Sequence, residues 1–240
     1  MNAFVLAAGF GKRMGSLTQN TPKPLLEIQS ITLLDYALYL LHIWKIQKVW
    51  INAHYLGEQI LNHVKNFTGF PIEVSIEKDK ILGTAGGIRT ALPENPDSEP
   101  ILLINPDTLF FPNSEFTPKH SLAEGIKIHL YVLPIPEGEN YTKISIRKDG
   151  TLEFGKGEFY YIGLSVIDPS CLSNLEKNHF YDLSDTFREC ANKGEITGEI
   201  FPGEVLDLGT KELWESYLNK DVFGSNLTKI KSFLSRSNMT

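Results

Sequence analysis

The order of apolar and polar segments in the first 107 residues is the feature that most limits the fold of this chain. Segments rich in β-branched and aromatic residues, which are typical of strands, alternate there with segments whose apolar residues recur at helical spacing. We expect strands at 2–8, 48–54, 72–76 and 100–107, and helices at 31–46, at 56–67 and from about Gly86 to Leu92. This alternation predicts an α/β fold, with a mostly parallel sheet and helices on both of its faces.

The second half of the chain is less regular and richer in predicted strands. Turn residues separate these strands, and Lys148-Asp149-Gly150 is suited to a hairpin turn. We expect strands at 126–134, 143–147, 151–154 and 159–168, and helices at 181–192, 210–220 and 226–236. The pattern predicts one domain over residues 1–240, in which a β-rich insert extends the sheet and walls a substrate pocket. The last helix is amphipathic, so we expect it to pack on the domain or to form an oligomer contact.

Composition and charge limit the class of partner. The 240 residues carry a net charge of −6, so we do not expect a nucleic-acid-binding surface, which is usually basic. The two cysteines, Cys171 and Cys190, form no metal-binding or disulfide pattern, which favours a reducing, cytoplasmic location. No segment approaches the roughly 18 apolar residues of a membrane span. The first positive charges follow the apolar N-terminal run, so we do not expect a secretory signal either.

A glycine-rich loop, Gly9-Phe10-Gly11-Lys12-Arg13-Met14, follows the first predicted strand. It lacks the third glycine of the dinucleotide-binding fingerprint, because Met14 stands at that position. Neither Ser nor Thr follows the lysine, so the loop is not a P-loop. One interpretation is a glycine-rich turn with two surface charges. The other is a phosphate cradle, in which backbone N–H groups, Arg13 and the proline-flanked Lys23 bind phosphate oxygens.

Four segments together resemble the signature of the sugar-1-phosphate nucleotidyltransferases, also called nucleotide-sugar pyrophosphorylases. They are LAAGFGKRMGSLTQNTPKPLLEI (6–28), LGTAGGI (82–88), LLINPDTLF (102–110) and VLDLGT (205–210). Their order and spacing fit the family. The short single-domain form is most similar to the uridylyltransferases for N-acetylmuramate 1-phosphate and to the guanylyltransferases for mannose or heptose 1-phosphate.

The resemblance implies a fold, a reaction and partners. The implied fold is Rossmann-like and glycosyltransferase-A-like, with a nucleotide-binding half (1–125), a sugar-binding half (126–220) and a C-terminal helix (221–240). The implied reaction is Mg²⁺-dependent attack of a sugar 1-phosphate on the α-phosphate of a nucleoside triphosphate (NTP), which gives an NDP-sugar and pyrophosphate. The implied nucleotide is UTP, GTP or CTP, and the implied protein is a cytoplasmic monomer or homodimer that binds neither nucleic acid nor membrane.

The resemblance also implies roles for particular residues. Arg13 and Lys23 are the implied catalytic residues, and Asp107 and Asp207 are the implied Mg²⁺ ligands. The implied nucleotide-binding residues are Leu6, Ala7, Ala8, Gly9, Gly11, Gly83 and Gly86, and the implied sugar-binding residues are Asn140, Glu153 and Gly163. Without the resemblance, Asp107 can be a turn residue after a strand, and Asp207 can be an acidic residue near a helix N-terminus or its cap.

Departures from the family pattern leave other functions open. Pro106 replaces the glycine of the usual Asn-Gly-Asp, so a backbone N–H is lost beside Asp107. Thr142 stands where many relatives have a glycine after tyrosine, and Glu153 and Lys156 match the family's Glu-Lys-Pro only loosely. Two alternatives therefore remain: a phosphocholine-type cytidylyltransferase of the same fold, and a nucleotide-binding regulatory homologue without turnover.

Overall fold

The computed structural model of the protein describes residues 1–94 and 99–238. The chain forms two compact units that interleave along the sequence. Unit 1 comprises Met1–Asn2, Leu82–Ile104 and Phe111–Glu204, and unit 2 comprises Ala3–Ile81, Asn105–Phe110 and Val205–Thr240. The predicted halves, divided at residue 125, stay a prediction, and the last two residues of the predicted C-terminal helix lie outside the described residues.

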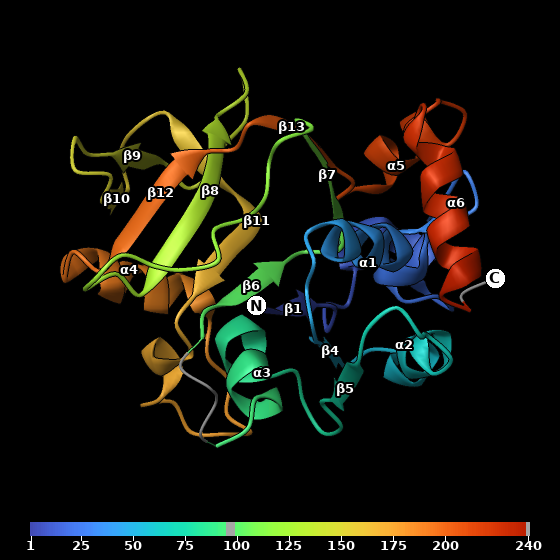
Figure 1. Cartoon of the computed structure of the whole chain (residues 1–240), viewed down its shortest axis with the longest axis horizontal. Helices are drawn as coiled ribbons and strands as arrows, with labels where there is room; N and C mark the ends of the chain where they lie inside the picture. Colours follow the sequence, from blue (N-terminus) through green and yellow to red (C-terminus); the bar gives the residue numbers. More distant parts are fainter. Residues whose placement is uncertain (95–98, 239–240) are drawn as a thin grey trace. The chain divides into compact units, whose positions relative to one another are not determined.

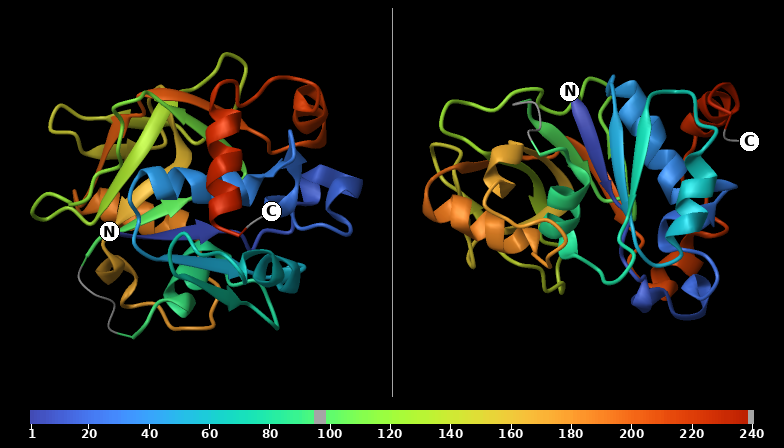
Figure 2. Two further views of the ribbon diagram at one scale, coloured as in Figure 1. Left: turned by 45° about the vertical axis from the view of Figure 1, so that its right-hand side comes forward. Right: turned by 90° about the horizontal axis from the view of Figure 1, so that it is seen from below.

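Unit 2 contains three parallel strands in the order β1-β4-β5 (Figure 2). Val49 of β4 is opposite Ala3 of β1 and Ile72 of β5. All five residues of β4 are buried, as expected of the middle strand of a parallel sheet. The elements that lie wholly or mainly in unit 2 are β1 (Asn2–Leu6), β2 (Glu27–Ile28), β3 (Ile31–Thr32), α1 (Leu33–Ile43), β4 (Val49–Ala53), α2 (Gly57–Val64), β5 (Ile72–Ile76), α5 (Lys211–Tyr217) and α6 (Asn226–Arg236).

A capping box fixes the start of α1. The Thr32 side chain accepts the N–H of Asp35, and the Asp35 carboxylate accepts the N–H of Thr32. This exchange satisfies two N-terminal donors of the helix. Asp35 also lies 2.8 Å from the Nε2 atom of His63 on α2, so the same carboxylate ties the two helices together. The predicted helix at 31–46 is therefore confirmed over Leu33–Ile43, whereas its first two residues form β3 and its last three lie outside the helix.

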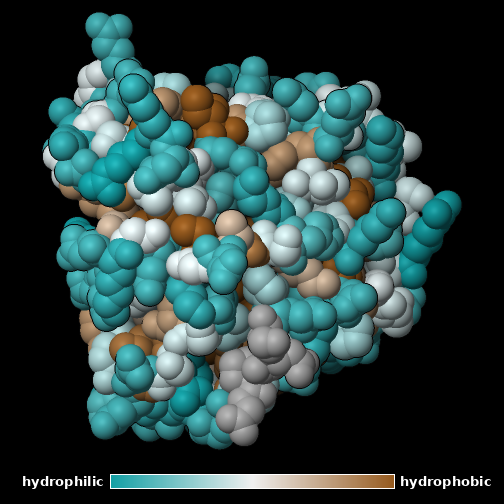
Figure 3. Space-filling view, turned by 60° about the vertical axis from the view of Figure 1, so that its left-hand side comes forward, coloured by the Kyte–Doolittle hydropathy of each residue, from teal (hydrophilic) through white to brown (hydrophobic). Residues whose placement is uncertain are grey.

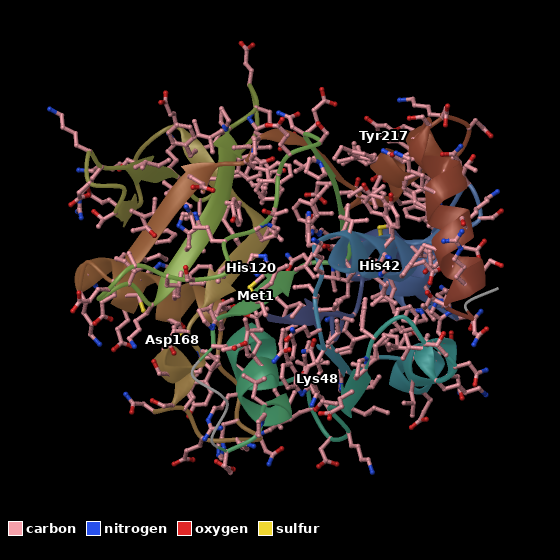
Figure 4. The ribbon with its side chains drawn as sticks, viewed as in Figure 1. Met1, His42, Lys48, His120, Asp168 and Tyr217 are labelled. Carbon is pink, nitrogen blue, oxygen red and sulfur yellow. The ribbon has the colours of Figure 1, made fainter. Side chains whose placement is uncertain are left out.

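The C-terminal helix packs on α1 within unit 2 (Figure 1). The ring of Phe233 lies 4.7 Å from that of His42 and 5.8 Å from that of Tyr39, both on α1. His42 is labelled on α1 in Figure 4. The side-chain oxygen of Gln29 accepts the N–H groups of Val222 and Phe223, which fixes the turn before α6. Its predicted packing on the domain is therefore observed, and its predicted role in an oligomer contact stays a prediction.

Unit 1 is built around β11, which has antiparallel partners on both sides. Strands β6, β8 and β9 pair with it in that sense, whereas β12 is parallel to β8. The hairpin predicted at 148–150 joins β9 to β10, with Gly150 at a φ of 82°. The elements that lie in unit 1 are α3 (Gly83–Ala91), β6 (Ile101–Ile104), β8 (Ile128–Pro134), β9 (Ile144–Ile146), β10 (Leu152–Phe154), β11 (Phe159–Ile167), a 3₁₀ turn η3 (Pro169–Leu172), α4 (Leu183–Asn192) and β12 (Ile196–Ile200).

The α/β class is confirmed, but the strands β2, β3, β7, β12 and β13 and the start of α3 were not predicted. Strand β12 has the sequence ITGEI, and glycine and glutamate are uncommon in strands, so its pairing with β8 was not visible in the sequence. Strands β7 (Thr108–Pro112) and β13 (Gly203–Asp207) pair with each other, and each runs from one unit into the other. Helix α3 begins at Gly83, three residues before the predicted start.

The face of the molecule shown in Figure 3 is mostly hydrophilic, with apolar atoms in separate small patches. Isolated apolar atoms of this kind are normal on protein surfaces. Within residues 1–94 and 99–238, no helix combines the length and the apolar composition that are needed to cross a membrane.

A buried histidine of β8, His129, is paired with Thr197 of β12 in unit 1. His129 is only 4% exposed, and its Nδ1 atom lies 2.9 Å from the hydroxyl oxygen of Thr197. Its Nε2 atom lies 3.6 Å from the carboxylate of Glu199, which also pairs with Lys119 at 2.9 Å. Burial lowers the pKa of His129 to about 4, and the opposing attraction of Glu199 is smaller.

We therefore expect stability to fall as the pH falls from about 6.5 to about 4. The unfolded chain takes up the His129 proton near the ordinary histidine pKa of 6.5, whereas the folded chain does so only at a pKa of about 4. Each pKa unit corresponds to about 1.4 kcal/mol, so the loss should reach roughly 2–3 kcal/mol at pH 4.5. Urea unfolding at pH 7 and pH 4.5 measures it. His129→Gln should reduce this pH dependence and His120→Gln, at an exposed site, should not; equal pH dependence in both variants would contradict the account.

Candidate functional site

The loop after β1 lines a pocket in unit 2. Its volume of about 330 Å³ is at the lower end of the range for small-molecule sites. Three segments of unit 2 that are distant in sequence meet there. The lining residues are Leu6, Ala7, Gly9, Phe10, Gly11, Lys12, Arg13, Lys23, Pro24, Pro106, Asp107 and Gly209. The loop and the proline-flanked lysine, predicted to act together, therefore line the same pocket.

Gly11 allows the loop to lie against the lysine segment. Its φ is 64°, in the left-handed region that favours glycine. A Cβ at this position would lie 2.9 Å from the Cγ2 atom of Thr18 and 3.2 Å from the Cβ atom of Lys23. The Thr18 hydroxyl donates to the Gly11 carbonyl at 3.1 Å, which closes the loop onto the 3₁₀ segment η1 (Lys12–Thr18). The fold of the loop itself therefore requires this glycine.

Gly9 differs from Gly11, because a Cβ built on it meets no other atom within 4 Å.

Met14 has a clear structural role, since its side chain is fully buried at the position where the dinucleotide-binding fingerprint has a glycine. The loop thus anchors itself in the core through a side chain, whereas the dinucleotide-binding loop brings a helix close to its strand. This is the physical reason why the fingerprint fails in this sequence.

Asn52 holds the start of the loop, and it was not predicted from the sequence. Its side-chain oxygen accepts the N–H of Ala7 at 3.0 Å, and its side-chain nitrogen donates to Glu77 at 2.8 Å. Asn52 and Glu77 are both buried, at 2% and 5% exposure. Buried polar groups are normally hydrogen-bonded, so an asparagine within an otherwise apolar strand indicates that such a partner exists. That was the signal available in the sequence VWINA of β4.

Lys23 is a buried cation paired with Asp107. It begins the 3₁₀ turn η2 (Lys23–Leu25), with Pro22 before it and Pro24 after it, so the prolines restrict its backbone as predicted. The residue is 8% exposed, and its Nζ atom lies 2.6 Å from the Oδ2 atom of Asp107. Buried charges are expected to have such partners. The side chain of Asp107 is 31% exposed, so the carboxylate keeps access to the pocket.

Asp207 lies close to Asp107, although the two are 100 residues apart in sequence. The N–H of Leu208 donates to the carbonyl of Asp107 at 3.2 Å. Burial and the negative charge of Asp107 raise the pKa of Asp207, while the charges of Lys23 and Arg13 oppose this shift. The convergence that the sequence predicted is therefore present.

Gly209 and Thr210, which follow Asp207 in the chain, account for the nearby turn and for the start of helix α5. A Cβ at Gly209 would lie 2.8 Å from the Oδ1 atom of Asp207 and 3.3 Å from a guanidinium nitrogen of Arg13, so a larger residue would crowd both charges. Thr210, rather than Asp207, caps helix α5, because its side chain accepts the N–H of Leu213. The alternative role of Asp207 as a helix cap is therefore wrong, whereas Asp107 does lie in a turn after β6.

The other predicted nucleotide-binding residues lie outside the lining of this pocket. Ala8 is buried in unit 2 beside the loop. Gly83 and Gly86 lie on α3 in unit 1. A Cβ on Gly83 would collide with the backbone carbonyl of residue 181, and a Cβ on Gly86 would collide with that of residue 179. The N–H of Gly86 donates to the carbonyl of Tyr181 at 3.2 Å. Close packing within unit 1 thus accounts for both glycines, and their role toward a nucleotide stays a prediction.

The three predicted sugar-binding residues lie in unit 1. Gly163, at a φ of 86°, lies where the pairing of β11 with β8 shifts register, which supports the alternative interpretation as a bulge. Glu153 forms ion pairs with Lys156 at 2.9 Å and with Arg147 at 3.2 Å. Asn140 lies in an exposed loop. Within the described residues, no hydrogen bond or ion pair joins these three to one another, and their sugar-binding role stays a prediction.

Alanine substitutions at the two loop glycines should separate their roles. Gly11→Ala should lower the free energy of unfolding by about 1–2 kcal/mol, because it places a side chain in the left-handed region and against Thr18. Gly9→Ala should change it by less than about 0.5 kcal/mol, because its Cβ has open space. Urea unfolding of the two variants makes the comparison. Equal destabilisation would contradict this description of the loop.

Comparison with known proteins supports the sequence resemblance. Residues 3–117 match the family of the MobA-like NTP transferase domain. The chain is 29% identical over 217 residues to the N-acetylmuramate alpha-1-phosphate uridylyltransferase of Neisseria meningitidis, a match that covers 88% of this chain and 94% of that protein. It is also 29% identical over 164 residues to the D-glycero-alpha-D-manno-heptose 1-phosphate guanylyltransferase of Aneurinibacillus thermoaerophilus, covering 68% of this chain and 70% of that protein.

Solved structures support the fold. A Bacillus anthracis chain, named as a candidate glucose-1-phosphate thymidylyltransferase, matches with a TM-score of 0.75 at 18% identity, covering 91% of this chain and 94% of that one. A UDP-glucose pyrophosphorylase solved with UDP-glucose matches with a TM-score of 0.68 at 19% identity, covering 91% of this chain and 98% of that one. These two structures confirm the predicted fold. The predicted resemblance to the sugar-1-phosphate nucleotidyltransferases is confirmed by the family match and the sequence relatives.

Proposed function

We propose that this protein is a sugar-1-phosphate nucleotidyltransferase, which makes an NDP-sugar from an NTP and a sugar 1-phosphate. The observation that carries the proposal is the meeting of a glycine loop, three cations and two carboxylates in and beside one pocket. This combination suits a reaction between two phosphate compounds. The named activities of the relatives support the same reaction class.

The chemistry requires orientation and charge more than a base. A phosphate oxygen of the sugar 1-phosphate attacks the α-phosphorus of the NTP, and the bond from that phosphorus to the pyrophosphate oxygen breaks. Because the second pKa of a phosphate monoester is about 6, the attacking group is already mostly dianionic near neutral pH. No proton has to be removed. The remaining task is to hold highly charged anions close together and in line.

The residues of the pocket divide this task. The N–H groups of the loop and the guanidinium of Arg13 would hold the leaving pyrophosphate, because a guanidinium donates two hydrogen bonds to one phosphate group. The ammonium of Lys23 would contact the α-phosphate and the incoming sugar phosphate. Lys23 is fixed between two prolines and Gly11 lies against it, so the loop and the lysine keep one relative position.

The two aspartates fit a Mg²⁺ site. Mg²⁺ commonly takes one or two protein carboxylates and completes its shell with water and phosphate oxygens. Asp107 and Asp207 offer that number. Burial and, after it, the negative charge of Asp107 raise the pKa of Asp207, and a bound cation would favour the charged form of both carboxylates. Among the described residues, no group of three or more His, Cys, Asp or Glu side chains could hold a metal ion, so water and phosphate oxygens would have to complete the shell around these two carboxylates. Bound Mg²⁺ would neutralise charge on the reacting phosphates.

The assay that tests the proposal also identifies the nucleotide base and the sugar. Pyrophosphate release should be measured for UTP, GTP, CTP and ATP, each with N-acetylmuramate, mannose and heptose 1-phosphates and with phosphocholine, with and without Mg²⁺. We expect Mg²⁺-dependent turnover of UTP or GTP with a sugar 1-phosphate. Turnover only of CTP with phosphocholine would favour the cytidylyltransferase. Nucleotide binding without turnover would favour the regulatory homologue. The departure from the family pattern at Pro106 is the reason for considering that alternative.

Lys23→Ala should lower kcat at least about 100-fold. Removing one preorganised charge-stabilising donor typically costs roughly 2.7–4 kcal/mol in the transition state. Lys48→Ala is the control, because this surface lysine of the same unit pairs with Glu73 and does not line the pocket. It should stay near the wild-type rate. A decrease in kcat of less than tenfold in Lys23→Ala would show that Lys23 does not contact the reacting phosphates.

Asp107→Asn should remove most of the turnover and keep the fold. Asparagine has nearly the same shape, but it lacks the charge that would bind the metal. Steady-state kinetics measures the loss, and circular dichroism checks the fold. Near-normal turnover in a folded Asp107→Asn protein would disprove the metal-binding role.

A further inference from the structure

The ammonium of Lys23 already binds one of the two carboxylate oxygens that Asp107 could offer to a metal ion. Its Nζ atom is 2.6 Å from Oδ2 of that carboxylate. A charge-assisted bond of this length is among the strong hydrogen bonds of proteins. A divalent cation must therefore displace the lysine, share the carboxylate with it, or bind elsewhere.

We propose that Lys23 occupies the metal site of the ligand-free protein and keeps divalent cations out until a phosphate group draws the ammonium away. Lys23 then acts as an internal cation that is exchanged for the metal ion as substrate binds. This inference rests on the proposed function, because the phosphate group is that of the nucleotide or the sugar phosphate.

The charges around the pocket support the exchange. Lys12, Arg13 and Lys23 contribute three positive charges, and Asp107 and Asp207 contribute two negative ones, which leaves a net charge of +1. A divalent cation alone would raise this charge to +3, which opposes binding. A phosphate anion lowers it, so the anion and the metal ion favour each other's binding. Such coupling is reciprocal by thermodynamic necessity.

The local structure allows the exchange without movement of the backbone. The backbone of Lys23 is held in the turn between Pro22 and Pro24, so it need not move. The side chain ends in a flexible four-carbon stem whose ammonium carries three donors in no fixed plane. The carboxylate of Asp107 is 31% exposed, so both a metal ion and a phosphate group can reach it from the pocket. Rotation of one side chain is therefore enough to release it.

Binding of Mn²⁺ to the nucleotide-free protein tests the proposal without any turnover. Its dissociation constant should be measured by electron paramagnetic resonance for the wild type, Lys23→Met and Lys12→Met. We expect Lys23→Met to bind Mn²⁺ at least about tenfold more tightly than the wild type, because Asp107 is released. Lys12→Met removes the same charge from the same pocket, but Lys12 packs over the ring of Phe10 and should change the affinity less than about threefold.

Two further variants test whether the gain in Mn²⁺ affinity comes from the release of Asp107. If Lys23→Met does not fold, Lys23→Gln removes the charge while it keeps a donor toward Asp107, and it should also bind Mn²⁺ more tightly. Lys23→Met combined with Asp107→Asn should lose the gain, since the released carboxylate is then absent. Circular dichroism checks that each variant is folded.

Three results would overturn the inference. They are an unchanged or weaker Mn²⁺ affinity in the Lys23 variants, an equal gain in Lys12→Met, and no Mn²⁺ binding by any variant. None of these results affects the proposed function, which is judged by pyrophosphate release in the presence of both substrates. Conversely, if the protein turns over no substrate but Lys23→Met binds Mn²⁺ tenfold more tightly, the inference stands and the proposed reaction is wrong.

Discussion

The ion pair between Lys23 and Asp107 is the interaction on which the pocket depends. It joins segments that are 84 residues apart, and the pairing of β7 with β13 then brings Asp207 to the same place. Gly11 permits the approach of the loop to Lys23, and the prolines limit the movement of the lysine backbone. Cations and carboxylates are thus held together before any ligand arrives, which is the preorganised arrangement that charge stabilisation requires.

Support for the pocket comes from buried groups that lie outside its lining. Asn52 fixes the first N–H after β1, and Glu77 in turn fixes Asn52. Met14 fills the core beneath the loop, and Thr18 closes the loop onto the Gly11 carbonyl. The charged groups are therefore carried by a backbone whose position is fixed by specific hydrogen bonds and by core packing. This is why small changes at Gly11 and Gly9 have such different expected effects.

Much of the fold and the centre of the site could be predicted from the sequence. Apolar periodicity located the helices α1 and α6, each of which buries one face, and the parallel strands β1, β4 and β5 of unit 2. The motif from Leu6 to Ile28 brought the loop and Lys23 together in the prediction, since its spacing encodes one local structure. The features that could not be predicted depend on pairing between distant segments: β12, β7 with β13, the pairing of Lys23 with Asp107, and the packing reason for Gly83 and Gly86.

The central claim is that one pocket holds the metal ion on Asp107 and Asp207 and the phosphates on the loop, Arg13 and Lys23. The most direct test is a crystal structure of the protein with Mn²⁺ and a non-hydrolysable NTP, with the metal located by anomalous scattering. We expect a single anomalous peak in contact with both aspartates, and the ammonium of Lys23 on a phosphate oxygen instead of on Asp107. A metal peak away from both aspartates, or phosphates bound outside the loop, would contradict the claim.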